Sequence, residues 1–190
     1  DRPLLALLAG SRKQEIRSNL PTMLRVAASF PAYQPVIAGA PGIDPALYTP
    51  FLAESSAQIV YGQTYDLLLH SDVALVTSGT ATLETALFRV PQVVCYYVAA
   101  GRLASFIFKH FFHTPFISLV NLIGGREIVQ ELFGARFSEE NIHAELARIV
   151  RDPAYRQRML AGYDEVIERL GEPGASRRAA QGMIAALRAQ

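Results

Sequence analysis

Residues 4–12 read Leu4-Leu5-Ala6-Leu7-Leu8-Ala9-Gly10-Ser11-Arg12, an apolar run that ends in a small polar turn. A continuous apolar run of this length is typical of a strand that is buried on both faces of a parallel sheet. Ser11 and Gln14 fit a capping box, and we expect a helix to follow over residues 13–30. Because a proline inside a helix removes a hydrogen bond, the helix is expected to restart at Pro21. The stretch therefore predicts a strand, a turn and a helix in succession.

The same alternation of strand and helix continues along the chain. Further strands are expected at residues 34–38, 58–61, 74–77, 91–96 and 116–118, and further helices at 44–55, 64–70 and 80–88. Such repetition of β-α units predicts an α/β fold, in which a parallel sheet carries helices on both faces. From about Arg126 onward the pattern is helical, with caps at Ser138 and Asp152 and a last helix at 175–189.

The bulk composition limits the classes of function. The chain has 190 residues, of which 51% are hydrophobic, and this suffices for one domain with a substantial core. A net charge of +1 gives no overall attraction to nucleic acid or to an anionic membrane, and no nucleic-acid partner is expected. The single cysteine, Cys95, cannot form an intrachain disulfide, so a reducing compartment is the default expectation.

The start of the chain has no pattern of a signal peptide. The apolar run at residues 4–8 is too short and lacks a charged segment before it, and no window of the sequence approaches a membrane span in length. The chain has no initiator methionine and begins directly before an expected buried strand. We therefore expect it to be a piece of a longer protein.

The turn Gly10-Ser11-Arg12 is the first candidate for a ligand site. In an open parallel sheet, ligands bind beyond the carboxyl ends of the strands. The glycine permits close approach of a ligand, and the helix amides together with the Arg12 guanidinium suit a phosphate oxygen. An ordinary strand-to-helix turn with a serine cap and a solvated arginine is the alternative, and taken alone the turn does not exclude it.

A second turn of this kind lies at Ser78-Gly79-Thr80-Ala81. Its small residues expose N–H groups at the positive end of a helix dipole, which favours a diphosphate. Glu84 follows Thr80 by four residues, so it lies on the same helix face and can accept two hydrogen bonds from a ribose diol. A capped helix with a solvated Glu84 is the alternative. Two such turns on one sheet edge favour a binding site, and the sequence has neither a Walker-A nor a G-x-G-x-x-G pattern, which makes ATP and NAD weaker candidates.

Two further segments carry groups that suit ligands. In residues 120–127, Asn121 could read the edge of a base or sugar and Arg126 could address a phosphate, whereas a glycine-rich loop with a surface ion pair is the alternative. Residues 101–113 mix aromatic and basic side chains, as at a membrane interface, although an amphipathic helix buried on the sheet is favoured. The histidines lack the spacing of metal ligands, so no metal is expected.

Taken together, these segments resemble the C-terminal half of lipid-A-disaccharide synthase, a glycosyltransferase of the GT-B type. The resemblance rests on residues 7–12 with Glu15, on Ser78-Gly79-Thr80-Ala81 with Glu84, on residues 91–96, and on Asn121-Leu122 with Gly125-Arg126-Glu127. It runs in order over essentially the whole chain. One departure is Ala9, where the family usually has proline.

The family enzyme has two Rossmann-like domains that face a cleft. The resemblance implies a Rossmann-like UDP-sugar-binding domain at residues 1–170 and a tail helix at 171–190 that packs on a separate N-terminal domain. It implies transfer of 2,3-diacylglucosamine from UDP to 2,3-diacylglucosamine 1-phosphate (lipid X), which forms lipid A disaccharide 1-phosphate and releases UDP. The general base is expected in the N-terminal domain, so this chain alone is expected to be inactive. No cofactor or metal is implied.

The resemblance also implies a location and a role for each site residue. The lipid substrates imply a cytoplasmic enzyme with peripheral contact to the inner membrane, and a homodimer is left open. Gly10, Ser11 and Arg12 would bind the diphosphate; Ser78, Gly79, Thr80 and Ala81 would cradle it with backbone amides; Glu84 would hold the ribose; and Asn121, Arg126 and Glu127 would bind donor or acceptor groups near the cleft.

Two rival interpretations remain open. The nearer one is another enzyme of the same architecture, such as a UDP-sugar 2-epimerase or a different UDP-glycosyltransferase. The other is a non-catalytic binding module with a flavodoxin-like sheet, which predicts no binding of UDP.

Overall fold

A six-stranded parallel sheet forms the centre of the computed structural model, with the strand order β3-β2-β1-β4-β5-β6. The structure describes residues 2–77, 79–98 and 116–171, together with the C-terminal positions Gly174, Ala180, Gln181, Met183, Ile184 and Leu187. The strands are β1 (Leu4–Leu8), β2 (Gln34–Gly39), β3 (Gln58–Tyr61), β4 (Ser71–Val76), β5 (Gln92–Tyr96) and β6 (Glu131–Phe133). Every neighbouring pair is parallel, which confirms the predicted α/β fold.

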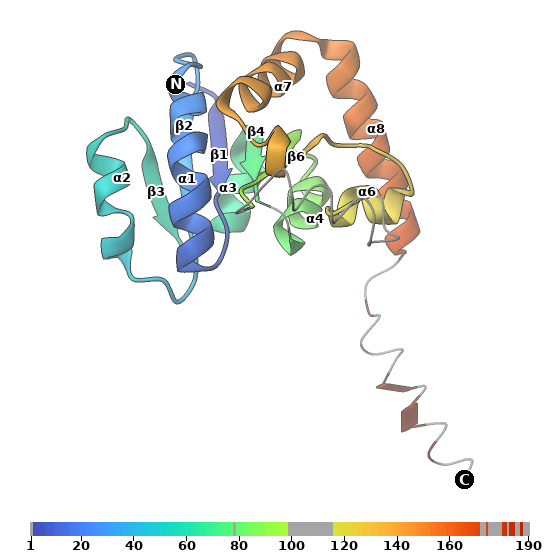
Figure 1. Ribbon diagram of the computed structural model, residues 1–190. Helices are drawn as coiled ribbons and strands as arrows, with labels where there is room; N and C mark the ends of the chain where they lie inside the picture. The colour runs from blue at the N-terminus through green and yellow to red at the C-terminus, as the bar shows by residue number, and fades with distance from the viewer. Residues whose placement is uncertain are drawn as a thin grey trace.

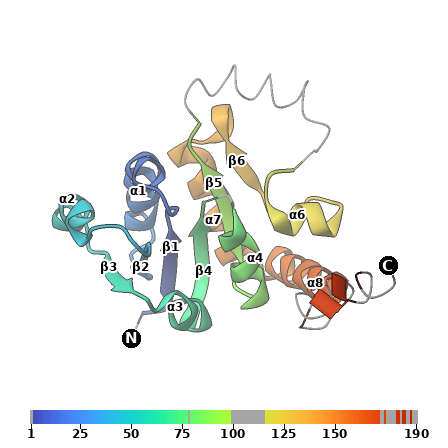
Figure 2. The same ribbon diagram turned by 90° about the horizontal axis from the view of Figure 1, so that it is seen from below.

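The helices cover both faces of this sheet (Figures 1 and 2). They are α1 (Lys13–Ala28), α2 (Thr49–Ala53), α3 (Thr64–His70), α4 (Thr80–Leu87), α6 (Leu119–Gly124), α7 (Glu139–Arg151) and α8 (Pro153–Leu170). Alternate side chains of β1 point to opposite faces of the sheet, because side chains along a strand repeat with a period of two. Leu5 and Leu7 belong to the core that contains α1 and α7, whereas Ala6 and Leu8 pack with α3.

The sixth strand does not lie where the sequence pattern predicted it. Residues 116–118 were expected as a strand, but Ser118 caps α6 instead, and the edge strand is β6. The carboxylate of Glu131 accepts hydrogen bonds from the N–H groups of Ile117 and Ser118, both at 2.9 Å, so a side chain takes the donors that a strand would have offered. The expectation of a purely helical pattern after Arg126 is wrong for the same reason, because β6 interrupts it.

Helix α1 also departs from two expectations. It continues through Pro21 without restarting, and its N-cap is Arg12, so the predicted box of Ser11 and Gln14 does not form. The missing N–H of Pro21 leaves the carbonyl of Arg17 without a helical partner, but Arg17 is exposed and water can hydrate that carbonyl. Buried side chains before and after Pro21, Leu20 and Met23 among them, hold both halves of the helix on the sheet.

The remaining boundaries follow the sequence pattern closely. Helix α3 and strand β3 have the expected bounds, and β4 begins three residues early, at Ser71. The helix expected at 44–55 is split into a short 3₁₀ turn at Pro45–Leu47 and α2. Among the described residues, no helix is both long and apolar enough to cross a membrane. The aromatic and basic residues 101–113 and most of the tail at 175–189 lie outside the described residues.

Candidate functional site

A pocket of about 620 Å³ opens at the carboxyl ends of the central strands. Seven of the eleven predicted site residues line it: Gly10, Ser11, Arg12, Gly79, Thr80, Ala81 and Glu84. Strands β1 and β4 are neighbours, and Thr77 at the end of β4 donates its N–H to the carbonyl of Leu8 at 2.8 Å. This pairing brings the two turns together although more than sixty residues separate them. Ser78 is not among the described residues.

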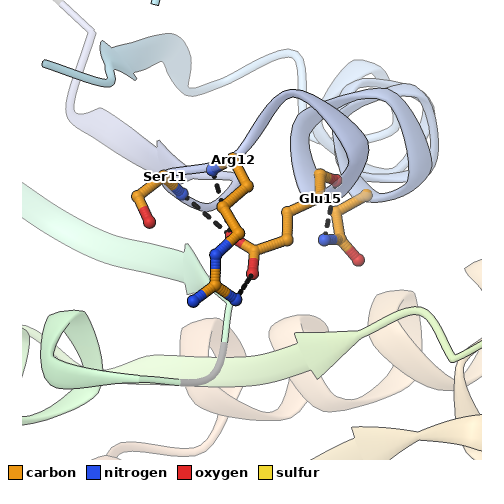
Figure 3. A network of polar contacts seen from close by, with 4 residues as sticks. Ser11, Arg12 and Glu15 are labelled. Carbon is orange, nitrogen blue, oxygen red and sulfur yellow. Dashed lines mark hydrogen bonds and ion pairs between the residues drawn. The ribbon is translucent and has the colours of Figure 1, made fainter. Parts of the chain in front are cut away.

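The first wall of the pocket is the turn between β1 and α1, which Glu15 organises (Figure 3). One carboxylate oxygen of Glu15 accepts hydrogen bonds from the N–H groups of Ser11, at 3.0 Å, and of Arg12, at 3.3 Å. The other oxygen pairs with the Arg12 guanidinium at 3.2 Å. Gly10 adopts a φ of +109°, and a Cβ there would lie 2.7 Å from Glu15, so only glycine lets this carboxylate fold over the turn.

Glu15 therefore occupies the amides that were expected to bind a phosphate at this turn. An acidic residue at this helix position suits the positive end of the helix dipole, which is the local signal that could have identified its role. The Arg12 side chain is nevertheless 81% exposed, so an anion in the pocket can reach its guanidinium.

The second wall is the start of α4. Gly79 has a φ of +133°, and a Cβ built on it would meet no atom within 4 Å, so the space beside this turn is open. The first N–H groups of a helix have no partner within it and lie at the positive end of its dipole. Thr82 donates its hydroxyl to the carbonyl of Gly79 at 2.8 Å and holds the turn in shape. Glu84 lies one helical turn further along, partly buried, in the pocket wall.

The third wall was not identified from the sequence. It consists of residues 38–41, at the carboxyl end of β2, and of Gly62, Thr64 and Tyr65 after β3. The ring of Tyr65 stacks on Phe88 with 5.4 Å between centroids. Gly39 is required because a Cβ there would lie 2.4 Å from the ring of Tyr61. The signal for this wall is positional, since these residues also follow the carboxyl ends of parallel strands.

Asn121, Arg126 and Glu127 do not line the pocket. Asn121 is fully buried, and its amide oxygen accepts hydrogen bonds from the N–H groups of Ile128 and Val129 at 2.7 and 3.0 Å. Its amide nitrogen donates to the carbonyl of Val129 at 2.8 Å, so in this conformation the side chain shapes the loop between α6 and β6.

The two charged residues of this segment have partners of their own. Arg126 forms an ion pair with Glu165 at 2.8 Å, with both side chains about half exposed. Glu127 accepts a hydrogen bond from Gln130 at 2.6 Å.

Metal ligation and thiol chemistry have little support in the described part of the chain. Within it, no three histidine, cysteine or acidic side chains are grouped as a metal site would require. Cys95 is fully buried, and desolvation raises the pKa of its thiol to about 12, so the reactive thiolate is strongly disfavoured. Among the described residues, the pocket thus offers helix amides, one exposed arginine and two carboxylates.

Comparison with known proteins identifies relatives of the whole chain. The model of the family described as lipid-A-disaccharide synthetase matches residues 1–185. Lipid-A-disaccharide synthase of Myxococcus xanthus is 38% identical over 97% of this chain and 49% of its own length. The synthase of Anaeromyxobacter dehalogenans is 37% identical over 98% of this chain and 50% of its own length. The chain therefore spans about half the length of the curated relatives that it matches.

A solved structure with the same fold is the calicheamicin glycosyltransferase. It has a TM-score of 0.60 and 20% sequence identity, and the match covers 97% of this chain and 42% of that one. This likeness supports the assignment of the sheet to one half of a GT-B architecture.

Proposed function

The chain belongs to the lipid-A-disaccharide synthetase family, and we propose that it supplies the half of such an enzyme that binds the nucleotide-sugar donor. The observation that carries the proposal is the pocket in which the turn at Gly10-Ser11-Arg12 faces the start of α4. A helix N-terminus and an exposed arginine are complementary to a diphosphate. Glu84, in the same wall, suits the hydroxyl groups of a ribose.

The reaction that we propose for the complete enzyme is a glycosyl transfer. A 2,3-diacylglucosamine moves from UDP to lipid X, which yields lipid A disaccharide 1-phosphate and UDP. Negative charge grows on the leaving diphosphate in the transition state, and groups that stabilise it there accelerate the reaction. Arg12 and the amides of Gly79, Thr80 and Ala81 are the groups of this pocket that can do so; Ser78 is assigned to the same cradle from the sequence.

The other components of this enzyme are also proposals. A further N-terminal domain would supply the general base for the acceptor hydroxyl, and the relatives' double length supports such a domain. The described tail residues Met183, Ile184 and Leu187 are 68%, 50% and 73% exposed, so an apolar tail is available to pack on that domain. Because the substrates carry acyl chains, we propose a cytoplasmic enzyme with peripheral contact to the inner membrane; a homodimer is an additional proposal.

Asn121, Arg126 and Glu127 remain proposed contributors to donor or acceptor binding at the cleft. They are not among the residues that line the pocket, which supports a contact with the sugar or acceptor side of the substrates rather than with the diphosphate. For Asn121, whose amide atoms are already bonded, the contribution would be indirect, through the shape of the loop that carries Arg126.

Calorimetric titration of the chain with UDP tests the proposal. Arg12→Ala and Glu84→Ala should each weaken UDP binding by about tenfold or more, since a hydrogen bond to a charged group contributes about 1.5–3 kcal/mol. Arg17→Ala is the matched control, because it removes an exposed arginine of the same helix that is not part of the pocket wall. Failure of the wild-type chain to bind UDP at millimolar concentration would contradict the proposal and favour a binding module of another kind.

A different UDP-sugar enzyme of the same architecture would pass that binding test. An activity assay of the complete enzyme distinguishes the two possibilities, because a lipid-A-disaccharide synthase should use acylated UDP-glucosamine and reject the non-acylated compound.

A further inference from the structure

Thr77 is the last residue before the turn that begins α4, and it lies on the floor of the pocket. Its N–H is bonded to the end of β1, and only 2% of the residue is exposed. It lines the pocket between the two turns, at Gly10 on one side and Gly79 on the other. Thr77 therefore borders the space in which the diphosphate is proposed to bind.

The hydroxyl oxygen of Thr77 is buried and has no hydrogen-bond partner. The two buried threonines that follow it differ: Thr82 donates to the carbonyl of Gly79 at 2.8 Å and Thr85 to that of Ala81 at 2.7 Å. In the described part of the chain, one other buried side-chain atom is in this state, an amide oxygen of Gln92, and Gln92 does not line the pocket. A buried hydroxyl without a partner destabilises the protein, so an unpaired one at a pocket floor points to a ligand.

We propose that Thr77 is a ligand-binding residue whose hydroxyl donates a hydrogen bond to a diphosphate oxygen of the nucleotide; this inference rests on the proposed function. An anionic oxygen is an acceptor, and a hydroxyl that lacks any acceptor in the free protein can supply its proton without breaking another bond. Thr80 and Ala81 at the start of α4, and Arg12 after β1, line the same pocket as Thr77. The Thr77 hydroxyl would add a further donor to this set.

The proposal predicts opposite effects of one substitution on stability and on binding. Thr77→Val keeps the shape of the side chain and removes the unpaired hydroxyl, so the unliganded chain should keep or raise its melting temperature. Its dissociation constant for UDP should rise about tenfold, the loss expected for one hydrogen bond to a charged group. Thr77→Ser retains the hydroxyl and should bind UDP within about threefold of wild type. A purely structural role predicts the reverse: lower stability with unchanged affinity.

The experiment titrates wild type, Thr77→Val, Thr77→Ser and Thr85→Val with UDP, pyrophosphate and uridine, with a melting curve for each variant. Thr85→Val is the matched control, because it removes a satisfied buried hydroxyl of α4 that does not line the pocket; it should lower stability and leave UDP affinity within about twofold. Thr77→Val should weaken UDP and pyrophosphate but not uridine.

Three other outcomes would contradict this inference, its assignment to the diphosphate, or the proposed function. If Thr77→Val binds UDP like wild type while Arg12→Ala does not, this inference fails and the proposed function stands. If Thr77→Val weakens uridine as much as UDP, the hydroxyl meets the nucleoside and the assignment to the diphosphate is wrong. If wild type binds neither UDP nor pyrophosphate, both the inference and the proposed function fail.

Discussion

Glu15 holds the position of an anion at the rim of the pocket. Its carboxylate accepts hydrogen bonds from the N–H groups of Ser11 and Arg12 and pairs with the Arg12 guanidinium. A negative charge at a helix N-terminus stabilises the helix, typically by about 0.3–1 kcal/mol. The same donors suit a phosphate oxygen, so we infer that Glu15 and a bound diphosphate compete for them.

Removal of this charge should therefore tighten nucleotide binding. Glu15→Gln keeps an oxygen that can accept from the two N–H groups but no longer repels the diphosphate or neutralises Arg12. We expect UDP to bind several-fold more tightly, with a larger gain at low ionic strength because screening weakens charge interactions. Calorimetry at two salt concentrations measures the effect.

The control is Glu140→Gln, which removes an exposed carboxylate from the first turn of α7 and does not alter the pocket wall. Weaker UDP binding by Glu15→Gln would contradict the competition and would show that Glu15 positions Arg12 for the ligand.

At the scale of elements, the contact between α8 and the segment after α6 depends on two small residues. Ile128 is buried between Gly124 of α6 and Gly162 of α8. A Cβ at Gly124 would lie 2.5 Å from the Ile128 side chain, and one at Gly162 would lie 2.6 Å from it. At Gly124 the close atom is the end of the Ile128 side chain, which can rotate away, whereas at Gly162 a methyl group would meet the branched part of that side chain. Gly162 therefore lets α8 approach Ile128 this closely.

Gly162→Ala should lower the free energy of unfolding by about 1–3 kcal/mol, because the added methyl overpacks the core. In a helix without such a contact the same change would stabilise the protein by about 1 kcal/mol through helix propensity. The sign of the change in the free energy of unfolding, measured by urea denaturation, therefore tests the contact between Ile128 and Gly162. In the Ile128→Ala background the added methyl should cost less, and a stabilising effect of Gly162→Ala alone would contradict this description of the interface.

Helix α1 shows how tertiary packing overrides a local preference. Proline disfavours a helix interior by about 3 kcal/mol, which is why a restart at Pro21 was expected. The helix is continuous because its apolar stripe is buried along its whole length, from Ile16 to Ala27, and burial of several such side chains exceeds the local cost.

The whole molecule is one sheet with its pocket at the carboxyl edge, matched to about half of each longer relative. Among the described residues, two carboxylates line that pocket: Glu15 is already paired with Arg12, and Glu84 is assigned to the ribose. Each of them thus has a role other than deprotonation of the acceptor. We therefore expect the base for the acceptor to come from elsewhere.

The 190-residue chain should accordingly bind UDP and transfer no sugar. Incubation with UDP-2,3-diacylglucosamine and lipid X, followed by measurement of released UDP, tests this at the scale of the whole molecule. The full-length synthase of Myxococcus xanthus is the positive control for the assay. Appreciable turnover by the chain alone would contradict the assignment of the base to another domain.

The sequence by itself determined the α/β class, the order of the first five strands along the chain, and two turns that line one pocket. It could do so because strand runs, caps and glycine turns are local patterns, and because parallel strands bring all their carboxyl ends to one edge.

Only the tertiary structure decided which groups of the pocket already have a hydrogen-bond partner within the protein and which can bind a ligand. It paired Glu15 with the predicted phosphate amides, buried Asn121 in its own loop, added the wall at Tyr65, and left the Thr77 hydroxyl without a partner. It also placed the edge strand at β6, three residues long, which is too short for a periodic pattern. These outcomes depend on contacts between residues distant in the sequence, and local periodicity carries no information about such contacts.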